Sequence, residues 1–269
     1  MNFSSPKLWG SSLRNPGFRS SAWRQRFDFS EIARLRYPLL FSLFLWPFSA
    51  LAETADVTTP AADFTASVES ALEKLDATNL EDDWYFTMDV VEEDELRIIH
   101  SDPHRDKYER RQLISVNGVA PDAERKEEFH DAEVERVDGL DPDNLGYSYM
   151  VDVQTLQLLE TGEDRAKFSF VPRVKALEES ADKIQGLLLL NLKSRQIEQI
   201  EITNTEQLSP AFSVTVDTYR LTLQFEQQQG ENLLSKLESH AAGKAGFVKS
   251  FDSLVGISFG DYKRAAPAP

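Results

Sequence analysis

Most of the chain after residue 83 alternates between apolar and polar side chains with the period of a β-strand. The first run covers residues 84–91 and has one strongly apolar face. Further strands are predicted from residue 96 and over 110–116, 154–160, 166–171, 184–192, 196–203, 212–227, 233–240 and 247–262. Their connections are short and rich in turn residues, Asn117-Gly118 among them, so consecutive strands are expected to pair. The pattern predicts a meandering antiparallel sheet of about nine or ten strands.

Two segments carry helical patterns instead. Apolar residues at helical spacing form a single stripe between residues 64 and 75, which predicts a helix lying against the sheet. That stripe consists of Phe64, Val68, Ala71, Leu72 and Leu75. A second, acidic helix is predicted over 123–137, because Pro121 precedes it at a position that a first helical turn tolerates. Residues 138–146 have the composition of a loop.

The alternation changes phase inside the longest predicted strand. Val214 and Val216 lie on one phase, whereas Tyr219 and Leu221 lie on the other, with the slip near Asp217. A one-residue slip would move every later side chain to the opposite face of the sheet. A β-bulge near Asp217 avoids this, and bulges increase the curvature of a sheet. We therefore expect a curved sheet.

The N-terminal residues have the order of an export signal. Residues 1–36 contain seven Lys and Arg but two acidic residues, and residues 38–49 are mostly apolar. The apolar run is about half the roughly 20 residues of a spanning helix, and Pro47 interrupts it, so no stable membrane anchor is expected. Small residues at Ala50 and Ala52 predict cleavage before Glu53 and a periplasmic location.

The predicted organisation is a cleaved signal peptide over 1–52, a flexible tail over 53–61, one domain over 62–264 and a disordered tail over 265–269. The whole chain has 29 basic and 45 acidic residues; losing seven and two of them leaves 22 and 43, a net charge of −21. This charge disfavours nucleic acid and anionic membranes as partners and leaves a basic envelope protein open. Without cysteine, the stability must come from the core.

The sequence has few candidates for catalysis. The histidines are His100, His104, His130 and His240, and Pro103 separates the first two, which disfavours a helical metal site. Acidic pairs are too common to identify a catalytic pair. The chain also lacks a nucleophile elbow, a phosphate-binding glycine loop and paired CxxC motifs. Neither an enzyme, a metal nor a cofactor is predicted.

Apolar side chains gather on single faces of several predicted strands. Such stripes most often form the core, but a sheet with few helices leaves apolar area that a lipid could cover. Each of these residues is a candidate for either role. The candidates for a cavity lining are Trp84, Phe86, Met88, Phe168, Phe170, Leu188, Tyr219, Leu221, Leu223 and Phe225.

Three stretches resemble the outer-membrane lipoprotein carrier superfamily, the LolA-like proteins. The first is the segment 111–121, which reads RQLISVNGVAP and runs into the charged helix near Phe129. The second combines Ser-Pro-Ala-Phe at 209–212 with Tyr-Arg-Leu-Thr-Leu at 219–223, and the third is Ser-Phe-Gly-Asp-Tyr at 258–262. The resemblance extends over about residues 64–262.

The resemblance implies an incomplete, curved antiparallel barrel with helices covering its open side, and so a mainly β fold. It also implies a periplasmic role in shielding acyl chains of a lipid or lipidated protein, without a cofactor. Carriers of this kind use an arginine to tether the covering helices, and Arg97, Arg111 and Arg220 are the candidates here. The alternative function is a non-enzymatic interaction or stress-sensing module that binds a basic partner through its acidic surface.

Overall fold

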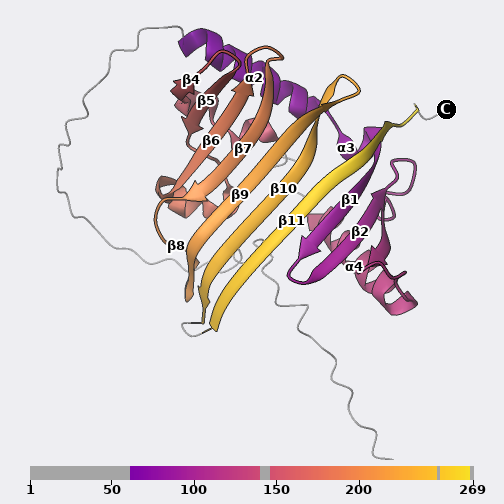
Figure 1. Ribbon diagram of the computed structural model, residues 1–269. Helices are drawn as coiled ribbons and strands as arrows, with labels where there is room; N and C mark the ends of the chain where they lie inside the picture. Colours follow the sequence, from indigo (N-terminus) through magenta and orange to yellow (C-terminus); the bar gives the residue numbers. More distant parts are fainter. Residues whose placement is uncertain (1–60, 140–145, 247–248, 267–269) are drawn as a thin grey trace, which may run out of the picture.

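The computed structural model describes residues 61–139, 146–246 and 249–266, and these form one large antiparallel sheet with a few helices (Figure 1). The predicted signal peptide and all but the last residue of the predicted tail at 53–61 lie outside the described residues, as do 140–145 of the predicted loop. The strands are β1 (Trp84–Glu92), β2 (Glu95–Ser101), β3 (Arg111–Val116), β4 (Gln157–Thr161), β5 (Arg165–Phe170), β6 (Ile184–Asn191), β7 (Gln196–Asn204), β8 (Leu208–Ala211), β9 (Val214–Gln228), β10 (Glu231–Ala245) and β11 (Lys249–Arg264).

The two predicted helices are confirmed. They are α2 (Ala61–Ala77) and α4 (Ala123–Gly139). Short helical turns that the sequence pattern did not reveal connect the strands. These are α3 (Leu80–Asp83), α5 (Tyr147–Met150), η3 (Val153–Thr155) and η4 (Lys175–Lys183). Because η3 takes up residues 153–155, the strand predicted from residue 154 begins only at Gln157.

The sheet has eleven strands in the order β3-β2-β1-β11-β10-β9-β7-β6-β5-β4, and β8 pairs with β9 beside this path. Since the two ends of the path do not meet, the sheet is an incomplete barrel, and the predicted mainly β fold class is confirmed. Most neighbours are consecutive hairpins, but β1 pairs with β11, so the first and last strands lie side by side. The Ala265 amide extends this contact by donating to the Asp83 carbonyl at 2.8 Å.

The predicted bulge is also confirmed. Thr218 of β9 pairs with Ala242 of β10 and Val216 pairs with Gly243, so Asp217 is the extra residue between them. The two strands approach closely here: a Cβ added to Gly243 would lie 2.0 Å from the backbone oxygen of Thr215. A glycine is therefore required beside the bulge.

Bulges also interrupt both edge strands. Ile114 is the extra residue of β3 opposite β2, and Leu159 is the extra residue of β4 opposite β5. Both side chains are about half exposed, at 49% and 53%. Bulges at the edges of an open sheet hinder pairing with another strand.

The buried side chains form three clusters. The largest joins the apolar stripe of α2 to β5, β6, β7, β9 and β10, with the Phe64 and Phe168 rings edge to face at 5.8 Å. The second is built mainly from β1, with Ile99, Leu113 and Leu233, and the half-buried Phe129 of α4 packs on it. The third joins η4 to β6, β8 and β9. The two long helices thus cover different parts of the sheet.

Candidate functional site

The burial of side chains falls sharply in the middle of the sheet. One row of paired residues can be followed across nine strands, and directly paired residues share a face of the sheet. The row runs Phe168, Leu188, Ile200, Leu223, Leu237, Ile257, Val90, Arg97, Val116. The first four residues are at most 4% exposed and Val90 is 6% exposed, whereas Leu237 of β10 and Ile257 of β11 are only half-buried.

β11 has no buried residue although it is an inner strand between β1 and β10. Half-buried Phe251, Ser253, Val255 and Ile257 occupy alternate positions next to exposed residues such as Leu254, although Gly256 is half-buried as well. An inner strand whose inward face is covered would show buried and exposed positions in alternation. The inward face of β11 is therefore only partly covered.

The incompletely buried apolar residues of this region form what we call the central strip. It consists of Tyr219 and Leu221 of β9, Leu237 of β10, and Val255 and Ile257 of β11. Tyr219, Leu221 and Leu237 pack against the cluster under α2, and Val255 and Ile257 pack against the β1 cluster. The strip therefore lies between the parts of the sheet covered by α2 and by α4, whose positions Figure 1 shows.

The cavity candidates predicted from sequence divide between core and strip. Tyr219 and Leu221 belong to the central strip, and burial raises the pKa of the Tyr219 hydroxyl. The other eight are at most 5% exposed and pack within the first two clusters. These eight are Trp84, Phe86, Met88, Phe168, Phe170, Leu188, Leu223 and Phe225. Leu237, Val255 and Ile257 were not among the candidates, because their partial exposure depends on the order of the strands.

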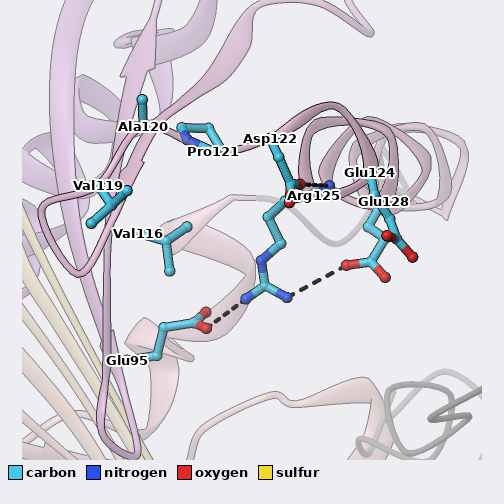
Figure 2. A pocket seen from close by; sticks show the side chains of 9 residues that line it. All are labelled: Glu95, Val116, Val119, Ala120, Pro121, Asp122, Glu124, Arg125 and Glu128. Carbon is cyan, nitrogen blue, oxygen red and sulfur yellow. Dashed lines mark hydrogen bonds and ion pairs between the residues drawn. The ribbon is translucent and has the colours of Figure 1, made fainter. Parts of the chain in front are cut away.

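Charged residues border the central strip at β1 and β2. Val255 pairs with Glu92, and Arg97 binds the Glu92 carboxylate at 2.6 Å. Arg125 of α4 reaches Glu95 at 2.5 Å, which fixes the start of this helix to the β1–β2 hairpin (Figure 2). A pocket of about 390 Å³ lies beside this ion pair, and its lining includes four carboxylates and Arg125.

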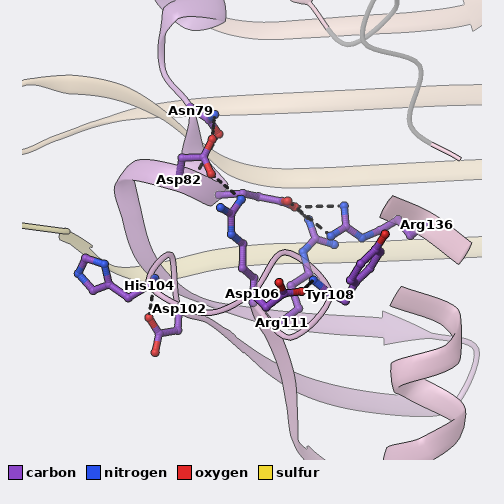
Figure 3. A network of polar contacts seen from close by, with 10 residues as sticks. Asn79, Asp82, Asp102, His104, Asp106, Tyr108, Arg111 and Arg136 are labelled. Atoms are coloured by element: carbon purple, nitrogen blue, oxygen red, sulfur yellow. Dashed lines mark hydrogen bonds and ion pairs between the residues drawn. The ribbon is translucent and has the colours of Figure 1, made fainter. Parts of the chain in front are cut away.

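A second group of ion pairs holds α3 and α4 to the sheet. Arg111 of β3 binds Glu81 at 2.5 Å and lies 3.9 Å from Glu133, which Arg136 binds at 2.8 Å. The guanidinium groups of Arg111 and Arg136 converge in Figure 3. Arg136 also lies 3.2 Å from Glu81, so two arginines share two carboxylates. Glu133 is only 8% exposed. The group therefore fixes α4 over β3 with a largely buried carboxylate.

The three arginines considered as tethers have different roles. Arg111 joins a strand to two helical segments, as a tether would. Arg97 binds Glu92 and Glu95, which belong to the same hairpin, and Arg220 lies 3.6 Å from Glu201 on the neighbouring strand β7. Of the three, Arg111 is the one whose ion pairs connect the sheet to helices.

A further polar contact anchors the turn after the predicted loop. The carboxylate of Asp76, near the end of α2, accepts hydrogen bonds from the backbone amides of Tyr147 at 2.5 Å and Ser148 at 3.1 Å. The Tyr147 ring packs edge to face on Phe225 at 5.2 Å. Burial, together with the charge of Asp76, raises the pKa of Tyr147 to about 12.

The described residues offer little catalytic chemistry. They contain no group of three potential metal ligands, and the His–carboxylate ion pair found among them joins His240 to Asp252 at 2.9 Å. Asp252 is exposed, and both residues lie on long strands. The buried carboxylate of Glu133 is bound by arginines. Within the ranges that the structure covers, no helix combines the length and apolar character needed to cross a bilayer.

Comparison with known proteins gives no assignment. No family model and no curated protein matches the chain. A solved structure described as an isomerase-inactive variant of GphF DH1 is 12% identical, and the alignment covers 76% of this chain and 83% of that one. Its TM-score is 0.16, which is too low to support an argument about fold or function.

Proposed function

We propose that the protein binds the acyl chain of a lipid or lipidated protein on the inward face of its sheet, along the central strip. The observation behind this proposal is that β11 has no buried residue although it lies inside the sheet. An apolar surface left in water costs about 25 cal/mol for each Å² that a ligand could cover. An acyl chain lying on the strip would cover such a surface without requiring polar contacts.

The dimensions of the strand suit a hydrocarbon chain. The strip extends along β10 from the row of Tyr219, which pairs with Ala241, to Leu237, a rise of four residues or roughly 14 Å of strand. The hydrocarbon core of a bilayer is about 30 Å thick and contains two chains end to end, so one chain occupies about half of that length. One acyl chain therefore fits along the strip between α2 and α4.

The proposed role is consistent with a periplasmic location, which the N-terminal sequence predicts. A carrier there must keep acyl chains out of water while remaining soluble itself. The large negative charge of the chain supports solubility. Each buried methylene contributes about 0.8 kcal/mol, so ten contacting methylenes would provide about 8 kcal/mol before the costs of association.

A second function is favoured by the pocket beside α4. Glu95, Asp122, Glu124 and Glu128 line it together with Arg125. This concentration of carboxylates is complementary to a Lys- or Arg-rich segment of an envelope protein. In that case the protein would act as an interaction or stress-sensing module, and binding would weaken steeply as the salt concentration rises.

Displacement of a fluorescent fatty acid from the chain starting at Glu53 tests the acyl-chain proposal. Leu237→Asp places a charge in the central strip and should weaken binding at least tenfold. Leu159→Asp is the matched control, because Leu159 is exposed on the edge strand β4 far along the sheet order from β10. Equal affinities for the two variants, or no displaceable binding to the wild type, would refute the proposal. Binding of a Lys-rich peptide that Glu124→Lys abolishes would support the second function instead.

A further inference from the structure

A second pocket lies at the open edge of the sheet, between β3 and α4. It has a volume of about 500 Å³. We call it the edge groove and define it by Arg105, Leu113, Ile114, Lys126, Phe129 and His130 of its lining. It lies beyond β3, whereas the central strip is on β9, β10 and β11, so the two surfaces are separate.

The floor of the edge groove is apolar. Leu113 is buried at 7% exposure, Phe129 is half-buried, and Ile114 is 49% exposed because the bulge of β3 turns it out of the strand pairing. The bulge also interrupts the regular backbone edge, which disfavours the addition of a peptide strand. A ligand in this groove would be recognised by side chains.

The rim of the edge groove is lined by basic side chains. Lys126 and His130 are one turn apart on α4, so both side chains lie on the same face of the helix. Neither side chain has an ion pair or hydrogen bond with any residue in the described part of the chain. Arg105 also lines the groove, and its guanidinium lies 3.5 Å from the Asp102 carboxylate. Glu109 is the carboxylate of the lining.

This charge is the reverse of that of the chain. The whole sequence has a net charge of −16, and the neighbouring pocket, which shares Ala120 and Pro121 with the edge groove, has four carboxylates in its lining. Ionic screening limits the influence of distant charges to about 8 Å at physiological salt. The groove therefore attracts an anion through its own side chains, and the carboxylates of the neighbouring pocket oppose this attraction.

Arg111 provides one more observation. The Nε of Arg111, a residue that also lines the groove, is buried and has no hydrogen-bond partner. A buried donor without a partner costs about 1–3 kcal/mol, and such a group often indicates an absent ligand or ion. The groove thus combines an apolar floor with basic side chains, and its lining includes an arginine with an unsatisfied donor.

We propose that the edge groove binds an anionic amphiphile, in which a carboxylate or phosphate head contacts Lys126 and His130 and a short apolar chain contacts Ile114 and Phe129. The proposal does not depend on the function of the central strip. Neutral amphiphiles lack the charge for the rim, and small anions lack the apolar part for the floor. Both parts are required for binding.

The test uses octanoate, octyl phosphate, octanol and acetate as probes of the chain starting at Glu53. Binding is followed by the NMR resonance of the His130 ring, which is identified by its loss in His130→Gln. Octanoate and octyl phosphate should shift this resonance with saturation, while octanol and acetate should bind at least tenfold more weakly. A difference between the first two probes distinguishes a carboxylate from a phosphate ligand.

Lys126→Glu provides the decisive variant, with Lys167→Glu as its control. Lys167 is exposed on β5, and Lys167→Glu changes the total charge of the protein by the same amount as Lys126→Glu. Lys126→Glu should weaken octanoate binding about tenfold, and Lys167→Glu should leave it unchanged. Equal weakening by both variants, or equal binding of octanoate and octanol, would overturn the proposal, as would an unmoved His130 resonance. Leu237→Asp should leave octanoate binding in the edge groove unchanged. The test of the edge groove therefore stays valid even if the central strip does not bind acyl chains.

Discussion

Leu237 lies directly opposite Ile257 across the β10–β11 pairing, and both side chains remain half-buried in the middle of an eleven-stranded sheet. In the same row, Leu188 lies opposite Ile200 and both are 1% exposed. The two pairs are chemically alike and differ in what covers them. This difference shows that the centre of the inward face is only partly covered by the rest of the protein.

The difference in burial predicts a difference in stability. Ile200→Ala should lower the free energy of unfolding by about 2–5 kcal/mol, because it removes a fully buried side chain and leaves a cavity. Ile257→Ala should cost about 1 kcal/mol, since water already reaches part of that side chain. Urea denaturation of both variants measures the two changes in unfolding free energy. Equal losses would mean that the strip belongs to the core.

The bulge at Asp217 predicts which glycine of the long strands is essential. Gly243→Ala should destabilise the protein by about 2 kcal/mol or more, because the new Cβ would overlap the Thr215 backbone oxygen. Gly256→Ala on the neighbouring strand is the control, since its Cβ would meet no atom within 4 Å. Thermal unfolding of the two variants compares them. A stable Gly243→Ala variant would contradict the close approach of β9 and β10.

The ion pairs around α4 predict that Glu133 contributes measurably to the free energy of unfolding. Glu133→Gln removes the charge that binds Arg136 and faces Arg111, and it should cost about 2 kcal/mol of unfolding free energy. Glu124→Gln in the exposed first turn of the same helix should change stability by less than about 0.5 kcal/mol. Chemical denaturation provides both values. A stabilising Glu133→Gln would show that burying this carboxylate costs more than its ion pairs contribute.

The raised pKa of Tyr147 predicts that the folded protein loses stability at high pH. Its pKa in the folded protein is raised to about 12, above the ordinary value of 10, so folding favours the protonated hydroxyl. This contribution is fully present below pH 10 and is lost between about pH 10 and 12, with a slope of up to about 1.4 kcal/mol per pH unit. Tyr147→Phe should therefore show a smaller decrease in unfolding free energy between pH 9.5 and 11. Parallel curves for the variant and the wild type would contradict the shift.

Much of the local structure follows from the sequence pattern. The α2 stripe and the alternation of β1 were predicted because one face of each element is strongly apolar, and burial follows that face. The bulge at Asp217 was predicted because the phase slip involves long runs on both sides. Ile114 and Leu159 gave no such signal, since each lies in a short edge strand.

The candidate site could be predicted only in part. Tyr219 and Leu221 were among the predicted residues, but Leu237, Val255 and Ile257 have the same apolar pattern as the core residues. Their exposure depends on β1 pairing with β11, a contact between distant parts of the chain. Similarly, three strand arginines were equivalent in sequence, and the placement of α3 and α4 distinguishes Arg111.

Photocrosslinking with a fatty acid that carries a diazirine near its tail tests the central claim most directly. Peptide mapping of the labelled protein should place the adducts on β9, β10 and β11, at or next to Leu221, Leu237 and Ile257. Excess unlabelled fatty acid should suppress them. Adducts confined to the exposed edge strand β4, or labelling that excess fatty acid does not reduce, would contradict the proposal that the central strip binds acyl chains.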